Sequence, residues 1–455
     1  MNPSLLTLTA QSAGGFSQAG LSVPFGQRLI GVLGLAIMIA IAYLMSSNRS
    51  RINWRLVVTG LALQGAFGFI VLRTDAGRAF FRTAGELVSG LLSYSTQGAR
   101  FVFGNLVDST IPVGVSEGGG VAPGEFVAHT ASFFAFNVLP TIIFFSSLMS
   151  VLYYLGVMQV VVKGIAWVMQ RTLGTSGAET LSASGNIFVG QTEAPLLIKP
   201  FVGKMTQSEL NTVMTGGFAT VAGGVLAAYV FMLQDAIPLI AGHLIAASVM
   251  NAPAGILLSK IIIPETKTPE TASSLQISVE RTESGVIDAA AAGASTGAQL
   301  AINVGAMLMA FVALLSVLNF LVGWIGGFFW LPELTIQTIL GTIARPLAWV
   351  MGIPWAETSY VGGLIGIKVV LTEFLAYGTL ASDLAADTLL SPRSAAIATY
   401  ALLGFANLPS IAIQIGGISG LAPERRADLA RLGLRAMVAG NLAAFMSASW
   451  AGMLM

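Results

Sequence analysis

Residues 289–332 contain no charged side chain, and this stretch constrains the fold more than any other feature of the sequence. A helix needs about 20 apolar residues to cross the hydrocarbon core of a bilayer, so the stretch is longer than one span requires. Only 9% of the 455 residues are charged and 55% are hydrophobic, whereas a soluble domain carries about 25% charged residues. The sequence therefore predicts a polytopic membrane protein and excludes a water-surrounded globule of this size.

Apolar stretches of spanning length recur along the chain. They cover residues 29–46, 53–72, 126–158, 208–234, 237–263, 297–331, 392–420 and 432–455. We expect an all-α polytopic membrane protein with about 8 transmembrane helices.

The placement of charges predicts the topology of these helices. The segment at 46–55 holds three arginines and no acid, and the segment at 423–435 is also rich in arginine, so both are placed in the cytoplasm. Residues 104–125 carry acids but no base and are placed outside. Residues 74–103 are expected to form a helix lying at the membrane interface, where arginines can snorkel. The polar loop at 264–285 divides the chain into halves and is placed in the cytoplasm.

Composition also excludes several kinds of site. There is no cysteine, and the two histidines, His129 and His243, are far apart in sequence. A disulfide framework or thiolate metal site is excluded, and a histidine-built metal centre is not expected. The net charge of +1 comes without a basic run, so nucleic acid is not an expected partner.

The two halves of the chain share short motifs in the same order. In the first half a Thr-Glu pair at 192–193 precedes "GFAT" at 217–220, and in the second half a Thr-Glu pair at 372–373 precedes "GFAN" at 404–407. Transporters are commonly built from two repeats whose interrupted helices meet at the substrate site. The pattern therefore predicts two repeats, each with a buried carboxylate and a broken helix.

Glu193 and Glu373 each lie among apolar residues. A charged side chain at mid-membrane costs about 2.5–3.5 kcal/mol, so such residues usually serve function. Glycines and Pro195 near Glu193 favour a helical hairpin whose tip lines a cavity. The alternatives are an interfacial carboxylate, an ion pair of Glu193 with Lys199, and a structural pair of Glu373 with Lys368.

The segment "GFANLPSIAIQIGG" at 404–417 combines polar residues with a proline inside an apolar stretch. Proline removes a backbone donor and breaks a helix, which frees carbonyl groups for an ion and side chains for a solute. The alternative is a kinked helix whose polar residues bridge neighbouring helices.

Five segments carry a resemblance to a known family. "GNIFVGQTEAPLLIKP", "MNAPAGILLSK", "NVGAMLMAFVALL", "EFLAY" and "GFANLPSIAIQIGG" resemble the concentrative nucleoside transporters, over roughly residues 30–455. The resemblance implies a homotrimer in which a scaffold holds a mobile transport domain. It also implies two inverted repeats, each with a re-entrant hairpin and a broken helix. The implied activity is sodium-driven import of nucleosides such as uridine, cytidine or adenosine across a bacterial inner membrane by an elevator-like motion.

The resemblance divides the chain into four parts. Residues 1–158 are expected to form scaffold helices with an interfacial helix, and 159–263 the first transport repeat. Residues 264–332 are expected to form the cytoplasmic loop and a scaffold helix, and 333–455 the second repeat.

Site residues carry over where the motifs match. The implied contacts to the nucleobase are Gln191, Thr192, Glu193 and Val225, and the implied contacts to the ribose are Glu373, Phe405, Asn407 and Ser410. The implied sodium ligands are Asn186, Val189, Thr220 and Val221. This chemistry suits a neutral polar solute, because a carboxylate can accept from both hydroxyls of a ribose diol.

Three positions depart from the family pattern. Thr372 replaces an asparagine, Pro409 replaces a small residue, and Thr220 replaces a serine at the ion site. Some family members use protons, so proton coupling is an alternative to sodium. Other open alternatives are a transporter of a different polar solute, a cation–proton exchanger, a membrane-embedded enzyme and a channel.

Overall fold

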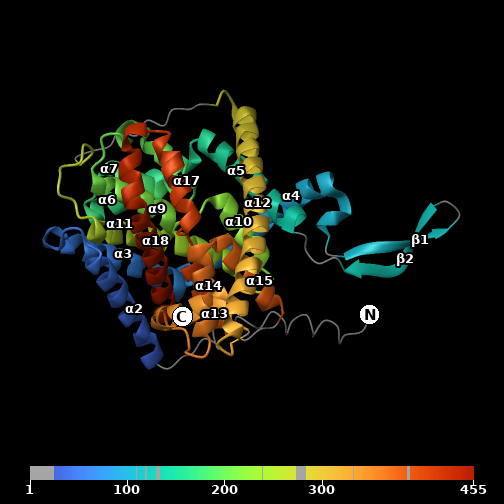
Figure 1. Ribbon diagram of the computed structural model, residues 1–455. Helices are drawn as coiled ribbons and strands as arrows, with labels where there is room; N and C mark the ends of the chain where they lie inside the picture. Colours follow the sequence, from blue (N-terminus) through green and yellow to red (C-terminus); the bar gives the residue numbers. More distant parts are fainter. Residues whose placement is uncertain are drawn as a thin grey trace.

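The structure is a computed structural model that describes residues 25–108, 110–117, 120–129, 134–237, 239–272, 283–331, 333–386 and 390–455. The helices are α2 (Phe25–Leu44), α3 (Trp54–Arg73), α4 (Asp75–Phe103), α5 (Phe134–Tyr154), α6 (Val157–Leu173), α7 (Gly177–Gly185), α8 (Lys199–Val202), α9 (Gln207–Ala219), α10 (Gly223–Leu233), α11 (Ile240–Ile262), α12 (Val286–Gly327), α13 (Ile336–Val350), α14 (Thr358–Val370), α15 (Glu373–Ala385), α16 (Pro392–Leu402), α17 (Leu408–Ser419) and α18 (Arg426–Leu454). Short 3₁₀ turns lie at Arg49–Arg51, Gly104–Val107, Ala194–Ile198 (η5) and Pro423–Arg425, and two strands are β1 (Thr110–Glu117) and β2 (Gly120–His129). Figure 1 shows that the helices form one bundle crossed on one side by α12.

Each of the eight apolar stretches contains a helix. Within the described residues, six segments are long and apolar enough to cross a membrane: α3, α5, the α9–α10 segment, α11, α12 and the segment that ends in α18. The apolar part of α2, together with α14 and α17, is shorter. The chain is thus a helical multi-pass membrane protein, and the total of about eight spans stays a prediction.

The amphipathic helix α4 covers the region expected at the membrane interface. Thr74 caps its first turn by accepting a hydrogen bond from the Gly77 backbone at 3.1 Å. Phe81, Val88 and Leu92 are buried on one side of α4, while Arg82 stays exposed. A helix with one apolar face and one charged face suits an interface better than a span.

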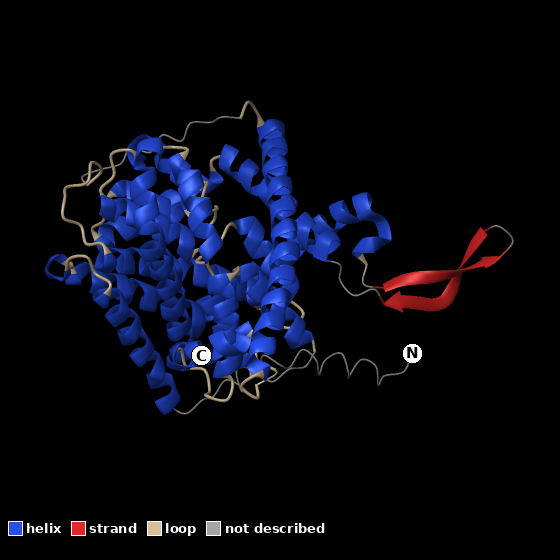
Figure 2. Ribbon diagram, in the orientation of Figure 1, coloured by secondary structure: helices blue, strands red, loops and turns tan. Residues whose placement is uncertain are grey.

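The expected span at 126–158 is wrong at its start. Residues 126–129 belong to β2, which pairs antiparallel with β1, and α5 begins only at Phe134. Figure 2 shows this β-hairpin projecting from the side of the helical bundle. Short apolar runs fit a strand as well as a helix, which is why the sequence did not separate the two.

Two helices are interrupted inside the bundle, and their interruptions touch. The chain leaves helical geometry between α9 and α10, at 220–222, and again between α16 and α17, at 403–407. The Phe405 backbone N–H donates to the Thr220 carbonyl at 3.3 Å. Gly404 has a φ of +109°, and a Cβ there would lie 2.6 Å from the Phe218 carbonyl oxygen. Only glycine fits this crossing of the two breaks.

Two helical hairpins approach the breaks. The first runs from α7 through a turn at 186–193 into η5 and α8, and the second runs from α14 through 371–372 into α15. Figure 1 shows α7 near one end of the bundle and α14 and α15 near the other. This is the arrangement expected if two repeats are inverted relative to each other, and the re-entrant path of the hairpins remains a prediction.

A buried ion pair anchors the base of the first hairpin. Lys260 of α11 lies 2.7 Å from Glu179 of α7, and the two side chains are 7% and 1% exposed. Ser176, which caps α7, also donates its hydroxyl to Glu209 of α9 at 2.6 Å. The hairpin base is therefore joined to both α9 and α11 by polar and charged groups that are almost completely buried.

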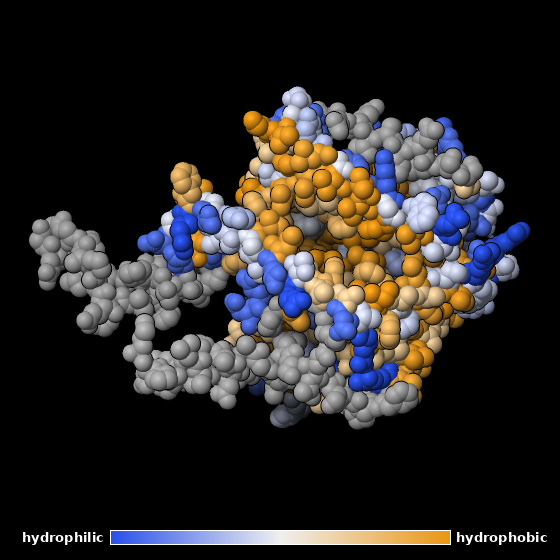
Figure 3. All heavy atoms as spheres, turned by 180° about the vertical axis from the view of Figure 1, so that it is seen from behind, coloured by the Kyte–Doolittle hydropathy of each residue, from blue (hydrophilic) through white to orange (hydrophobic). Residues whose placement is uncertain are grey.

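The outer surface is apolar where helices would meet lipid. On α12, Met309 is 74% exposed, Phe320 72% and Trp324 62%. Apolar side chains also cover much of the opposite face, around a central hollow (Figure 3). Apolar surface on this scale requires an apolar surrounding, which is a bilayer or a second subunit.

Candidate functional site

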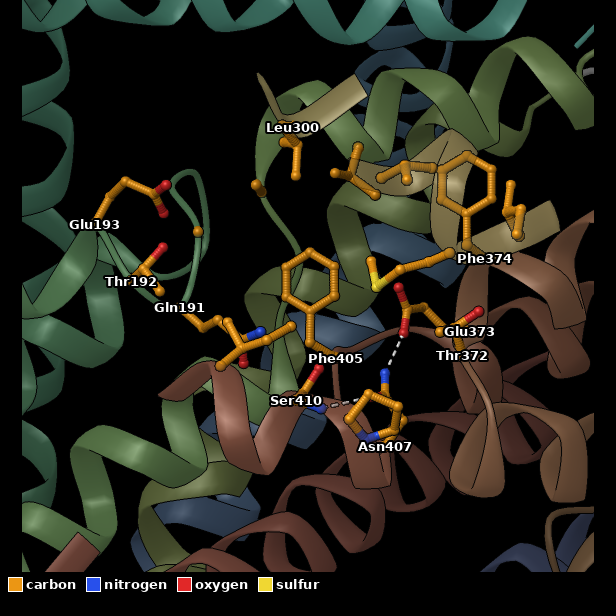
Figure 4. A pocket seen from close by; sticks show the side chains of 18 residues that line it. Gln191, Thr192, Glu193, Leu300, Thr372, Glu373, Phe374, Phe405, Asn407 and Ser410 are labelled. Carbon is orange, nitrogen blue, oxygen red and sulfur yellow. Dashed lines mark hydrogen bonds between the residues drawn. The ribbon is translucent and has the colours of Figure 1, made fainter. Parts of the chain in front are cut away.

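A cavity of about 140 Å³ lies where the hairpin tips and the helix breaks meet. Its lining includes all the residues expected to contact a substrate: Gln191, Thr192, Glu193, Val225, Glu373, Phe405, Asn407 and Ser410. Helix α12 closes one side of it with Leu300, Val304, Met307 and Leu308. The structure thus brings together side chains from the first half of the chain, the second half and α12 (Figure 4).

The second hairpin places a firmly held carboxylate at one end of the cavity. Glu373 begins α15 and is only 4% exposed. Its Oε1 accepts from the Tyr229 hydroxyl at 2.9 Å, and its Oε2 accepts from Asn407 Nδ2 at 2.7 Å. Asn407 in turn caps α17, since its Oδ1 accepts from the Ser410 backbone at 2.9 Å. Each carboxylate oxygen keeps a lone pair for a further donor, such as a sugar hydroxyl.

The first hairpin places an amide at the other end. Gln191 is 7% exposed, and its Oε1 accepts from Gln414 Nε2 at 3.0 Å. Gln414 also donates to the Met214 carbonyl at 3.1 Å. This end of the cavity therefore offers amide and hydroxyl groups that can both donate and accept.

Glu193 differs from its expected environment. It was expected to be buried, but in the single chain its side chain is exposed, while Thr192 is half-buried. The carboxylate folds back over Gly190, where an added Cβ would lie 2.1 Å from Oε2. Figure 4 shows Glu193 and Glu373 on opposite sides of the cavity, with the Phe405 ring between them. Glu193 is exposed because it lies at the hairpin tip, where no described element of this chain covers it.

The alternative ion pairs do not form. Lys368 donates instead to the carbonyls of Ala401 and Leu403, at 2.9 and 3.1 Å. Neither Glu373 nor Glu193 has a lysine or arginine within ion-pair distance among the described residues. Both carboxylates therefore remain available at the cavity.

The expected sodium ligands lie on two segments that touch, the first hairpin tip and the break after α9, since the Gly223 backbone N–H donates to the Phe188 carbonyl at 2.9 Å. Asn186 is fully buried, and neither its Oδ1 nor its Nδ2 has a hydrogen-bond partner among the described residues. Val189 lies on the same tip, while Thr220 and Val221 lie in the break after α9. Thr220 donates its hydroxyl hydrogen to the Gly216 carbonyl at 2.9 Å, so its oxygen lone pairs stay free. An unpartnered buried amide beside unwound backbone has the hard oxygen donors that sodium needs.

Comparison with known proteins identifies the family. Residues 33–106 match the domain described as "Na+ dependent nucleoside transporter N-terminus", and residues 243–452 match the corresponding C-terminus. Residues 135–236 match the domain "Gate: Nucleoside recognition". The chain is 43% identical to nucleoside permease NupC of Helicobacter pylori, over 93% of this chain and 97% of that protein.

The chain belongs to the concentrative nucleoside transporter family.

Other members support this assignment. Solute carrier family 28 member 3 of Homo sapiens is 40% identical over 94% of this chain, which spans 60% of that longer protein. A solved structure described as CNTnw in an inward-facing substrate-bound state is 47% identical, covers 94% of this chain and 97% of its own, and has a TM-score of 0.82. A variant of CNTnw in an outward-facing state reaches a TM-score of 0.85 at 48% identity, over 95% of this chain and 99% of its own. Family and neighbours are transporters, so the membrane-enzyme alternative is excluded.

Sequence reasoning missed several residues around the cavity. Tyr229 was not singled out, although a tyrosine in the apolar run of α10 is a visible polar signal. Gln414 stood out as polar within 404–417 but received no role. The α12 residues were treated as scaffold only, because nothing local in an apolar helix shows which side faces a cavity.

Proposed function

We propose that this protein imports nucleosides by symport with sodium across the inner membrane of a bacterium. The observation that carries the proposal is a cavity with a held carboxylate at one end and an amide at the other, together with a buried asparagine on the first hairpin that has no hydrogen-bond partner among the described residues. The family assignment supports nucleoside transport in general, and the site residues are proposed from the family resemblance together with their place at the cavity.

The cavity has the polarity of a nucleoside. Glu373 and Asn407 would meet the ribose, and Gln191, Thr192 and Glu193 would meet the base. The hydrophobic side chains of Phe405 and Val225 would lie between, against the ring faces. Every hydroxyl and amide of a nucleoside must find a partner on leaving water, and this lining offers one at each end.

Sodium would bind between the first hairpin tip and the first helix break. Asn186 and Thr220 would supply side-chain oxygens, and Val189 and Val221 would supply backbone carbonyls. No hydrogen bond reaches either of these two carbonyls within the described residues. One bound charge is enough energetically. Moving it through 100 mV is worth about 2.3 kcal/mol, and a tenfold gradient adds about 1.4 kcal/mol.

Alternating access would move the hairpins and breaks past α5 and α12. This assigns 1–158 and 264–332 to the scaffold and 159–263 and 333–455 to the moving domain. The cavity lies on that boundary, because α12 lines it together with both repeats. A homotrimer would cover the apolar surface of α12 that one subunit leaves exposed.

Uptake of labelled uridine into proteoliposomes tests the proposal. Uptake under a sodium gradient, and none under a proton gradient alone, is the expected result. Uptake under a proton gradient alone would still support the nucleoside site, but it would assign the coupling role to a carboxylate and not to a sodium site. No uptake of uridine, cytidine or adenosine by folded protein would contradict nucleoside transport.

Asn186→Ala separates sodium from nucleoside binding. Removing the buried amide should raise the sodium concentration for half-maximal uptake about tenfold, since a ligand oxygen is lost. Uridine affinity measured at saturating sodium should change far less. Equal loss of both affinities would argue that Asn186 has only a structural role.

A further inference from the structure

Gln414 lies one layer behind the cavity, on α17, and is fully buried. It does not line the cavity, yet its Nε2 donates both to Gln191 Oε1, at 3.0 Å, and to the Met214 carbonyl, at 3.1 Å. One amide nitrogen therefore joins the hairpin tip to the backbone of α9.

The Met214 carbonyl fixes which way both amides face. A carbonyl oxygen can only accept, so Gln414 must present its NH₂ group to it. That same NH₂ reaches Gln191, so the atom it meets there must be Oε1. Reversing the Gln414 amide would set two oxygens against each other. It would also move the NH₂ group to the present position of Gln414 Oε1, which is buried and has no hydrogen-bond partner among the described residues.

The Gln191 side-chain amide is therefore held in one orientation. With Oε1 engaged, its Nε2 is the group left to meet a molecule in the cavity, and it has no hydrogen-bond partner within the described part of the chain. We propose that Gln414 is a positioning residue that fixes Gln191 as a hydrogen-bond donor toward the base, so that the site selects nucleosides whose base offers an acceptor at that edge. The inference rests on the proposed nucleoside site.

Neighbouring glycines hold this arrangement in register. A Cβ on Gly217 would lie 2.8 Å from Gln414 Nε2 and 2.9 Å from Gln191 Cβ. A Cβ on Gly417, one turn beyond Gln414, would lie 2.7 Å from Thr192 Cγ2. The hairpin tip is thus seated against α9 at Gly217 and against α17 at Gly417, which leaves Gln191 little freedom to turn its amide.

Gln414→Glu should reverse the preference. A glutamic acid at 414 would give its one proton to the Met214 carbonyl, so toward Gln191 it could only accept, and Gln191 would turn its NH₂ toward it and its oxygen toward the cavity. Two probes report this change: uridine, whose base has acceptors and an N–H, and the riboside of pyrimidin-2-one, whose base has acceptors and no N–H. The ratio of their dissociation constants should shift about tenfold against the acceptor-only base. Gln414→Met, which releases Gln191 without turning it, should shift the ratio by about two- to threefold.

The test measures both dissociation constants by calorimetry on purified full-length protein at saturating sodium. A double-mutant cycle with Gln191→Met isolates the coupling, because the effect of Gln414→Glu must vanish without the Gln191 amide. The ratio of uridine to 2′-deoxyuridine, which reports the ribose end, should stay unchanged. Gln64→Met is the matched control, since Gln64 is a fully buried glutamine on α3 that does not line the cavity.

Every result of this test either supports the inference or overturns it. An unchanged ratio in Gln414→Glu, or an equal change in the Gln191→Met background, overturns the inference and leaves the nucleoside site standing. If Gln414→Glu does not fold, an unchanged ratio in Gln414→Met overturns it equally. Unmodified protein that binds no nucleoside at all overturns the proposed function instead.

Discussion

At the scale of single residues, Glu373 shows how an apolar protein keeps a carboxylate ready for a ligand. Tyr229 and Asn407 reach it from α10 and from the break before α17, one donor to each oxygen. Held in this way, the group loses little rotamer freedom when a ligand arrives, and such preorganisation favours binding.

Tyr229→Phe should weaken nucleoside binding. The ring still stacks on Tyr377, 4.3 Å away between centroids, so packing persists while one hydrogen bond to Glu373 is lost. A hydrogen bond to a charged group is worth about 1.5–3 kcal/mol, so we expect the Km for uridine uptake to rise about tenfold or more. An unchanged Km, with normal thermal stability, would show that Tyr229 does not orient Glu373.

Gly217→Ala should impair uptake because the new methyl would press on the Gln191–Gln414 contact. Overpacking of this kind costs about 1–3 kcal/mol. The matched control is Gly164→Ala on α6, where nothing lies within 4 Å of an added Cβ. Uptake assays should show a loss of about tenfold for the first variant and none for the second, and equal uptake by the two would contradict the tight contact at 217.

The residues of the site were predictable to different degrees. The Thr-Glu pairs and the GFA motifs are local signals, and both Thr-Glu pairs line one cavity together with Phe405 and Asn407 of the second GFA motif. The exposure of Glu193 and the roles of Tyr229 and Gln414 depend on side chains brought together from distant segments. A short stretch of sequence does not show which distant side chains will surround a given residue in the fold.

At the scale of elements, the broken helices depend on side chains from other helices. Lys368 of α14 is fully buried and caps the end of α16 through the Ala401 and Leu403 carbonyls. Asn251 of α11 donates to Ala219 at 2.7 Å, and Asn441 of α18 donates to Ala406 at 2.8 Å. At each break, therefore, an asparagine from the helix after the broken pair satisfies a carbonyl: α11 follows α9 and α10, and α18 follows α16 and α17.

Lys368→Met should lower the melting temperature by several degrees. It removes two hydrogen bonds, each worth about 0.5–1.5 kcal/mol, and leaves two buried carbonyls unpaired at a cost of about 1–3 kcal/mol each. The control is Lys163→Met, because Lys163 is exposed on α6. Equal melting temperatures for both variants, measured in the same detergent, would show that the cap contributes nothing to stability.

Helix positions followed from hydropathy because lipid leaves few other options for the backbone. The β1–β2 hairpin was not anticipated, and α12 begins at Val286 rather than near 297. Small residues such as the alanines at 289–292 carry little hydropathy signal, although they form helix readily.

At the scale of the whole molecule, the proposed moving domain meets the scaffold where α10 packs on α5. A Cβ on Gly224 would lie 3.2 Å from the Ser146 hydroxyl and 3.3 Å from the Ile142 carbonyl oxygen. The two backbones approach closely here, and no large side chain interlocks between them at this point.

Cross-linking this contact should stop transport. The chain has no cysteine, so Gly224→Cys with Ser146→Cys introduces a single disulfide pair. Oxidation should abolish uridine uptake, and reduction should restore it. The single variants Gly224→Cys and Ser146→Cys are the matched controls, because each has no second cysteine to pair with, and they should keep uptake under the same oxidation. Full activity of the oxidised double variant would rule out movement of α10 past α5.

The contact between the two helix breaks also bears on how strongly sodium binding and nucleoside binding are coupled. Thr220 would hold sodium with its hydroxyl, while its carbonyl oxygen accepts from the backbone of Phe405 in the cavity wall. Linkage is reciprocal, so any factor by which sodium raises nucleoside affinity is also the factor by which nucleoside raises sodium affinity. When nucleoside is scarce, the sodium site would then also be less occupied. Little sodium would therefore cross the membrane on transporters that carry no nucleoside.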